Sequence, residues 1–347
     1  MTERSERGGS HRDDRGGHGE RRYRDGEHGY RRGSGGGDRG YRGGAGRGGD
    51  RGHRGSDRGY RDRERGRSRR VYDDEPRDGL LADLIGHLHA LDGRSYAAYK
   101  AIVGRYRAPA GWFLHIDRVQ SDPYAPPTRI HVDVPTDLHG LELLDEADLL
   151  ADVDRRLAVG DFLTRELHAG FRGTALSIAS PGQEILQRSS IIVRPDEKKE
   201  GAGWILEARA RLALPAQGRS IQGHEASRIV GRDLVRELEE AMDLTGERGD
   251  RLVHHIATLE DHRALTATVA RNGWVSFLAD GSVLPRRSGV SDEPLDGGVP
   301  LEAPESMAAT VELPHAGTVR GTVVEAGVNV IVGGGYHGKS TLLSAIE

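Results

Sequence analysis

The residues best suited to chemistry stand near the end of the sequence, in "GGGYHGKS" at 333–340. This stretch fits G-x-x-x-x-G-K-[ST] at every defined position, and an apolar run, "VNVIV" at 328–332, precedes it. Glycines let backbone N–H groups wrap around a phosphate without a Cβ clash, and a helix N-terminus adds partial positive charge. The spacing therefore predicts a strand, a phosphate-binding loop and then a helix.

Each polar residue of the loop has an expected role at a bound nucleotide. Lys339 is predicted to bridge the β- and γ-phosphates as the catalytic cation, Ser340 to ligate Mg²⁺, and Thr341 to reach the α-phosphate. Only four lysines stand beside 46 arginines, and a compact ammonium suits this position. The rest of the predicted nucleotide-binding set comprises Gly333, Gly334, Gly335, Tyr336, His337 and Gly338. We expect the His337 side chain to point outward.

A second candidate is the loop "ADGSVLPRRSG" at 279–289, which follows the short apolar strand predicted for 274–279. Arg286 and Arg287 stand there beside a proline and glycines, where a rigid scaffold often presents functional residues. They are candidate contacts for phosphate or nucleic acid. The alternative reading is a solvated basic turn.

The elements that must position these loops form a predicted α/β fold, a mixed α+β domain over 76–300 followed by the start of a P-loop domain over 301–347. Apolar residues at helical spacing predict helices over 78–93, 95–106, 144–170, 225–244 and 250–273, the last as one helix or two. Asp78 and Gly93 are the expected cap and stop of the first helix. Alternating apolar residues predict strands at 111–119, 129–134, 174–180, 187–193 and 203–215. The strand order does not follow from the sequence.

Residues 1–75 are predicted to be a disordered basic tail. Residues 1–70 hold 21 Arg, 21 Gly and 12 acidic residues, with no Leu, Ile, Val, Phe or Trp, so they cannot bury a core. That stretch carries +9, and because the whole chain carries −4, residues 71–347 carry −13. Repeats such as "DRGYR" and spaced tyrosines are typical of RGG-type arms that contact RNA or other single-stranded nucleic acid. The alternative is a flexible tail that keeps the protein in solution.

Several classes of protein are excluded or disfavoured. The chain has no cysteine, which excludes disulfides and thiolate metal sites. No segment approaches the ~20 apolar residues of a membrane span, and the N-terminus lacks the apolar core of a signal peptide, so we expect a cytoplasmic protein. The pairs His87/His89 and His254/His255, with His262, are spaced poorly for sharing one metal ion and are predicted to be ordinary histidines.

Beyond the loop, longer stretches make the sequence resemble the predicted ATPases of the ABC class, a family of large soluble proteins. They are "LDGRSYAAYKAIVGRY", "IDRVQSDPYAPPTRIHV", "GQEILQRSS", "LPAQGRSIQG", "FLADGSVLPRRSGVSDEPL" and "GGGYHGKSTLL", and together they cover about 80–347. The resemblance implies an α/β N-terminal domain that leads into an ATPase domain binding and hydrolysing ATP with Mg²⁺. It also implies a homodimer or internal pseudo-dimer, and a functional role for the 279–289 loop.

Two departures limit what the resemblance implies. An ABC fold stacks an aromatic residue on adenine, and none stands at 308–325; the residues alone do not choose between ATP and GTP. The sequence also ends before the family's Walker B and signature motifs, so we expect an N-terminal fragment that is catalytically incomplete by itself. The competing hypothesis is a non-catalytic nucleic-acid-binding protein that holds nucleotide as a structural ligand.

Overall fold

The computed structural model describes residues 77–199, 203–291, 293–335 and 337–347. The tail predicted for residues 1–75 and the predicted site residue Tyr336 lie outside the described residues. Within them the fold is mixed α/β, as the sequence predicts.

A seven-stranded sheet organises the first part of the described chain. Its strands run in the order β1-β2-β3-β4-β7-β5, and β6 also pairs with β7. The first pair is parallel and the other pairs are antiparallel. The bounds are β1 Arg77–Leu80, β2 Gly104–Arg107, β3 Phe113–Arg118, β4 Thr128–Pro135, β5 Leu176–Ser177, β6 Ile191–Pro195 and β7 Trp204–Leu212.

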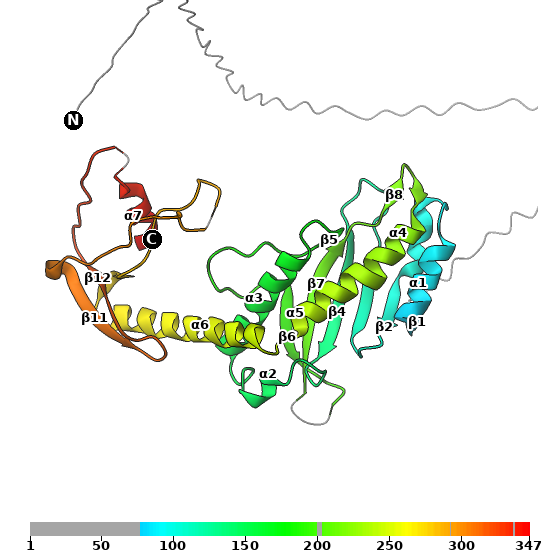
Figure 1. Ribbon diagram of the computed structural model, residues 1–347, viewed down its shortest axis with the longest axis horizontal. Helices are drawn as coiled ribbons and strands as arrows, with labels where there is room; N and C mark the ends of the chain where they lie inside the picture. Colours follow the sequence, from blue (N-terminus) through cyan, green and yellow to red (C-terminus); the bar gives the residue numbers. More distant parts are fainter. Residues whose placement is uncertain (1–76, 200–202, 292, 336) are drawn as a thin grey trace, which may run out of the picture. The chain divides into compact units, whose positions relative to one another are not determined.

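Helices pack on one face of this sheet, where α4 and α5 cross the strands (Figure 1). Alternate residues of β4, namely Ile130, Val132 and Val134, are buried in one hydrophobic core with side chains of these helices. The opposite side chains of β4 are charged or polar, as half-buried strands require. The helices are α1 Leu81–Ala90, α2 Leu143–Glu146, α3 Val153–Gly170, α4 Gly223–Arg228, α5 Val235–Met242 and α6 Glu247–Arg271. A 3₁₀ helix spans Tyr96–Ile102, a π-helical turn spans Ile229–Leu234 between α4 and α5, and β8 Ala216–Gln217 pairs with β9 Ser220–Ile221.

A three-stranded antiparallel sheet follows α6. Its order is β10-β12-β11, with β10 Trp274–Ala279, β11 Ala308–Leu313 and β12 Gly317–Glu325. Phe277, Val311 and Val323 form a second, smaller core against the C-terminal half of α6. A 3₁₀ turn at Glu305–Met307 lies between β10 and β11. The last helix, α7, spans Lys339–Ile346 and follows β12 in the chain.

Two predicted helix boundaries were wrong, for local reasons. Asp78 does not cap α1, because it belongs to β1 and pairs with Arg105 of β2. The helix begins at Leu81 instead, and the Asp83 carboxylate accepts a hydrogen bond from the Leu80 backbone N–H. The helix expected over 95–106 is a 3₁₀ helix followed by β2, because the chain turns at Gly104, which has φ +152°.

The long helix expected over 144–170 is divided into α2 and α3. Asp148 lies between them with φ 51°, a left-handed conformation that breaks a right-handed helix. Asp152 then starts α3 as its cap, because its side chain accepts the Arg155 backbone N–H. The range 250–273 forms one helix, α6, and 203–215 contains β7, as predicted.

Candidate functional site

The glycine-rich loop leads directly into α7, as predicted. Gly338 is the cap of this helix and has φ +73°, a left-handed conformation that favours glycine. Because Gly338 carries no side chain, no side-chain cap covers the first turn. The N–H groups at the start of a helix have no intrahelical acceptor, so Lys339, Ser340 and Thr341 present backbone donors to an anion.

The side chains of the loop fold back over it. Lys339 Nζ donates a hydrogen bond to the carbonyl oxygen of Gly334 at 2.5 Å. The backbone N–H of Gly334 donates to Nδ1 of His337 at 3.0 Å. His337 is exposed, and its Nδ1 accepts a hydrogen bond from one of the amides that the loop would otherwise offer to phosphate.

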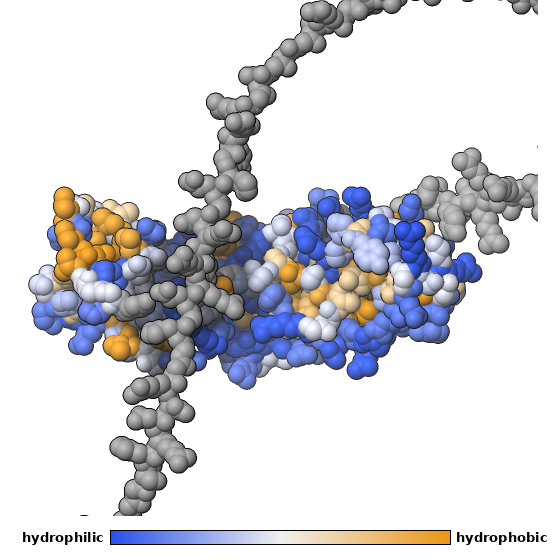
Figure 2. Space-filling view, turned by 90° about the horizontal axis from the view of Figure 1, so that it is seen from above, coloured by the Kyte–Doolittle hydropathy of each residue, from blue (hydrophilic) through white to orange (hydrophobic). Residues whose placement is uncertain are grey.

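The strand predicted for "VNVIV" is not formed. Residues 328–332 are irregular, and Val328 and Val332 are 97% and 83% exposed. A strand needs a hydrogen-bonded neighbour, and the described residues place none beside this segment. Leu342 and Ile346 of α7 are only half-buried and Leu343 is 49% exposed, so none of these three side chains is buried in a core of the described residues. Figure 2 shows apolar surface in two separate areas of the described part of the chain.

A cavity of about 1010 Å³ lies between α7 and the loop that follows β10. Ser340, Thr341 and Ser344 line it on the α7 side, and Arg286 lines it from the loop. Two predicted groups of site residues, distant in sequence, thus share one cavity. Further lining residues are Ser282, Val283, Leu284, Val290 and Pro294.

Arg287 has a different role from Arg286. Its guanidinium pairs with Glu293 and, at 3.3 Å, with Asp296. The backbones of Arg286 and Pro294 form a bridge in the same loop. Arg287 therefore fastens the loop to itself and is not among the residues that line the cavity.

Three of the five histidines considered from the sequence contact other side chains. His87 lies 2.8 Å from an Arg77 nitrogen, and His89 Nε2 lies 2.6 Å from the hydroxyl oxygen of Ser227. His255 Nε2 lies 3.2 Å from the carboxylate of Asp161.

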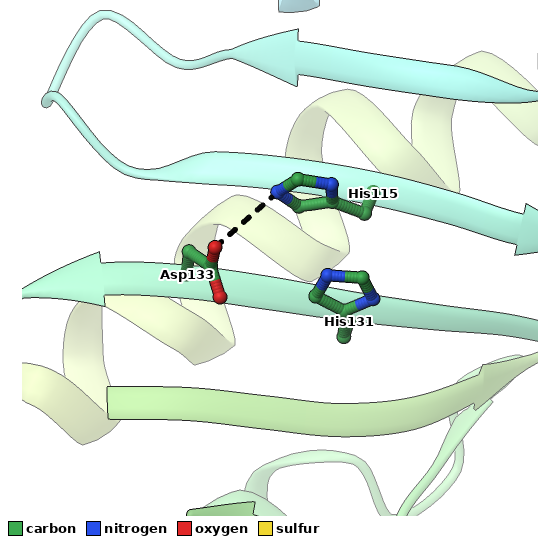
Figure 3. Close-up of side chains that lie close together, drawn as sticks. All are labelled: His115, His131 and Asp133. Carbon is green, nitrogen blue, oxygen red and sulfur yellow. Dashed lines mark ion pairs between the residues drawn. The ribbon is translucent and has the colours of Figure 1, made fainter. Parts of the chain in front are cut away.

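A cluster that was not predicted from the sequence lies on the sheet face opposite the helices, where His115, His131 and Asp133 project from β3 and β4 (Figure 3). The two imidazole rings stack with centroids 4.1 Å apart, and ligand atoms of all three residues lie within 4.8 Å of one another. The signal was present: "HID" at 115–117 and "HVD" at 131–133 put a histidine and an aspartate on one face of each strand.

The bonding of this cluster favours an ion-pair network over a metal centre. His131 Nδ1 lies 2.9 Å from Asp117, and Arg194 donates to Asp133 at 3.0 Å. Burial raises the pKa of Asp133, but His115 and Arg194 outweigh it and the pKa lies below its usual value. A guanidinium on the carboxylate competes with a metal cation for the same oxygens. His115 Nε2 is buried without a hydrogen bond and lies 3.5 Å from Asp133.

The residues of the glycine-rich loop fit a nucleotide triphosphate with Mg²⁺. The donors are backbone N–H groups, the Lys339 ammonium supplies positive charge, and the Ser340 hydroxyl is a hard oxygen ligand. The left-handed Gly338 and the helix start behind it have the chemistry that phosphate groups require.

Comparison with known proteins gives two matches. The model of the N-terminal domain of ATPases of the ABC class matches residues 81–244, and the model of the P-loop domain of ABC ATPases matches residues 248–347. A search of curated proteins found no match. None of the described helices is both long and apolar enough to cross a bilayer.

Proposed function

Since the chain belongs to the family of ATPases of the ABC class, we propose that residues 333–341 bind the triphosphate of ATP with Mg²⁺ at a site for ATP hydrolysis. The observation that carries the proposal is the left-handed Gly338 at the start of α7, with the Lys339 ammonium folded over the loop onto Gly334. A cation held beside uncapped helix amides is a ready site for an anion.

The roles of the residues follow from their chemistry. Lys339 exchanges its carbonyl contact at Gly334 for phosphate oxygens, which are stronger acceptors because they are charged. The ring of His337 leaves the Gly334 N–H, which then becomes a phosphate donor. Ser340 would hold Mg²⁺, and Thr341 would reach the α-phosphate. In hydrolysis the γ-phosphoryl group passes to water, its bond to the bridging oxygen breaks and a nucleoside diphosphate leaves; Mg²⁺ bound at Ser340 would supply positive charge against the phosphate oxygens.

A titration of the purified chain with a fluorescent ATP analogue tests this proposal. We expect Lys339→Ala to weaken binding by about tenfold or more, because one charge-assisted contact contributes about 1.5–3 kcal/mol. Lys100→Ala, which removes a lysine on the exposed side of the 3₁₀ helix, is the matched control. Equal affinities of Lys339→Ala and the unaltered chain would contradict the proposal.

The tail supports a second proposed role, contact with RNA or other single-stranded nucleic acid. Its support is the composition of residues 1–70, 21 arginines among 21 glycines with interspersed tyrosines. The log of the affinity for a single strand should fall with the log of salt with a slope near about −0.7 per neutralised phosphate. An RNA affinity that is unchanged after deletion of residues 1–70 would exclude a role of this tail in RNA binding.

Two further predictions remain proposals. ABC ATPases close two nucleotide sites across a head-to-tail pair, so we propose a homodimer, measurable by light scattering with and without ATP. The cytoplasmic location likewise stays a prediction. The competing hypothesis is a nucleic-acid-binding protein that holds nucleotide only as a structural ligand. It is favoured if the Lys339→Ala variant keeps both its RNA binding and every activity linked to RNA.

A further inference from the structure

The open face of the seven-stranded sheet carries a row of arginines. Arg118, Arg129 and Arg211 stand directly opposite one another across β3, β4 and β7. Side chains opposite each other in a sheet have Cβ atoms about 4.5–5.5 Å apart, and like charges there are destabilising. All three side chains are exposed on the face away from the helices.

These three arginines have no counter-ion in the part of the chain that the structure describes. Among the described residues, none of them takes part in a side-chain hydrogen bond or an ion pair, whereas nearby Arg194 and Arg209 both bind Glu207. A sheet that places three guanidinium groups in one row without carboxylates bears an electrostatic cost. A bound anion would remove this cost, because guanidinium binds oxyanions through paired N–H donors.

The row borders a concave pocket rather than a flat surface. The pocket has a volume of about 680 Å³ and is lined by Arg129, Arg209 and Arg211 from β4 and β7. Hydroxyl groups surround the arginines, from Ser177, Ser180, Ser189 and Ser190. The Asp117 carboxylate also lines the pocket, but it is bonded to His131 at 2.9 Å. Arg209 is paired with Glu207, so two arginines without an ion-pair partner among the described residues, together with four hydroxyls, face one acid that already has a partner.

We propose that this pocket binds a phosphate group of a small phosphorylated molecule. Guanidinium and serine hydroxyl groups are the donors that phosphate oxygens accept from most readily, and the volume lies in the range of small-molecule sites, about 300–1,000 Å³. Residues 71–347 carry −13, so a long polyanionic strand would be repelled outside the pocket whereas a compact phosphate would not. The site is separate from the glycine-rich loop.

Calorimetric titration of the full chain with inorganic phosphate at constant ionic strength tests the proposal. Lys339→Ala is introduced throughout, so that the glycine-rich loop does not contribute to the signal. We expect Arg129→Thr with Arg211→Thr to lower phosphate affinity by about tenfold or more. Arg107→Thr, an exposed arginine on β2 outside the pocket, is the matched control and should bind as before.

Two additional measurements separate binding from folding. The double threonine variant should melt at the same or a higher temperature than its parent without phosphate, since like-charge repulsion is relieved. Arg211→Lys keeps the charge but loses the planar fork, and should weaken phosphate binding several-fold with no loss of melting temperature.

The outcomes decide between sources of the phosphate. Absent phosphate binding, or an equal affinity in the double variant, overturns the proposal. A single-stranded uridine 12-mer that binds more tightly than inorganic phosphate, and loses this affinity in the double variant, overturns it in favour of nucleic acid. Selective loss of phosphate binding with a weak or unaltered response to the 12-mer supports it.

Discussion

The carboxylate of Asp161 lies 2.9 Å from Nε of Arg188, and its side chain is fully buried. Arg165 Nε donates to the same carboxylate at 2.7 Å, and His255 of α6 lies 3.2 Å from it. Burial by itself raises the pKa of Asp161, but the hydrogen bonds from His255, Arg165 and Arg188 outweigh it and lower the pKa to about 2. One carboxylate thus joins α3, α6 and the segment at 184–188.

Acid should weaken this junction. The pKa of Asp161 is lower in the folded chain than the ordinary value of 3.8, so its contribution to stability is present above about pH 4 and is lost as the pH falls toward 2. The pKa difference corresponds to about 2 kcal/mol of unfolding free energy. Urea unfolding of the unaltered chain and of Asp161→Asn between pH 7 and pH 2 should give two curves that converge in this window. Parallel curves would contradict the assignment.

Gly223 should not tolerate a side chain. It lies at the start of α4, and a Cβ there would fall 2.1 Å from the Leu88 carbonyl oxygen and 2.8 Å from the Asp92 backbone nitrogen. We expect Gly223→Ala to lower the free energy of unfolding by about 1–3 kcal/mol, the usual cost of overpacking. Gly86→Ala, on the exposed side of α1 with open space around it, should instead raise it by about 0.5–1 kcal/mol. Urea denaturation of both variants measures the difference in sign.

Local patterns predicted the central elements well. The alternation in 129–134 and 203–215 corresponds to β4 and β7, and the stripe in 225–244 to α4 through α5. These patterns report burial of one face, which a single segment encodes by itself. The helix prediction for 95–106 was wrong because Gly104 begins β2. The strand β2 forms by pairing with β1 and β3, and this pairing depends on residues outside the segment.

The candidate site also has a part that is encoded locally and a part that depends on distant residues. The glycine-rich loop and the start of α7 are local, so motif spacing located them. The strand at 328–332 depends on a hydrogen-bonded neighbour, which the segment cannot encode alone. Arg129 and Arg211 lie opposite each other because β4 and β7 pair in an antiparallel register. The residue spacing within either strand does not predict this neighbourhood.

Gly338→Ala should weaken nucleotide binding without unfolding the chain. The residue has φ +73° and nothing within 4 Å of its Cβ position, so the cost is backbone strain of about 1–2 kcal/mol, not a clash. The strain will redirect the loop, and we expect ATP affinity to fall by about tenfold. Gly317→Ala, with φ +65° at the first residue of β12, should carry equal strain and leave ATP affinity unchanged. Fluorescence titration compares the two variants.

Ser340→Ala should reduce only the part of ATP affinity that depends on Mg²⁺. In the proposed site the Ser340 hydroxyl would be a hard oxygen ligand for the ion, and its loss would leave the phosphate contacts proposed for Lys339 and the backbone amides in place. ATP titrations in excess Mg²⁺ should therefore show weaker binding than the unaltered chain, and titrations in EDTA should show equal binding. Ser220→Ala, an exposed serine of β9 outside this cavity, should behave like the unaltered chain in both buffers, and Ser340→Thr should retain the response to Mg²⁺. A loss of the same size with and without Mg²⁺ would assign Ser340 to phosphate contact rather than to the metal.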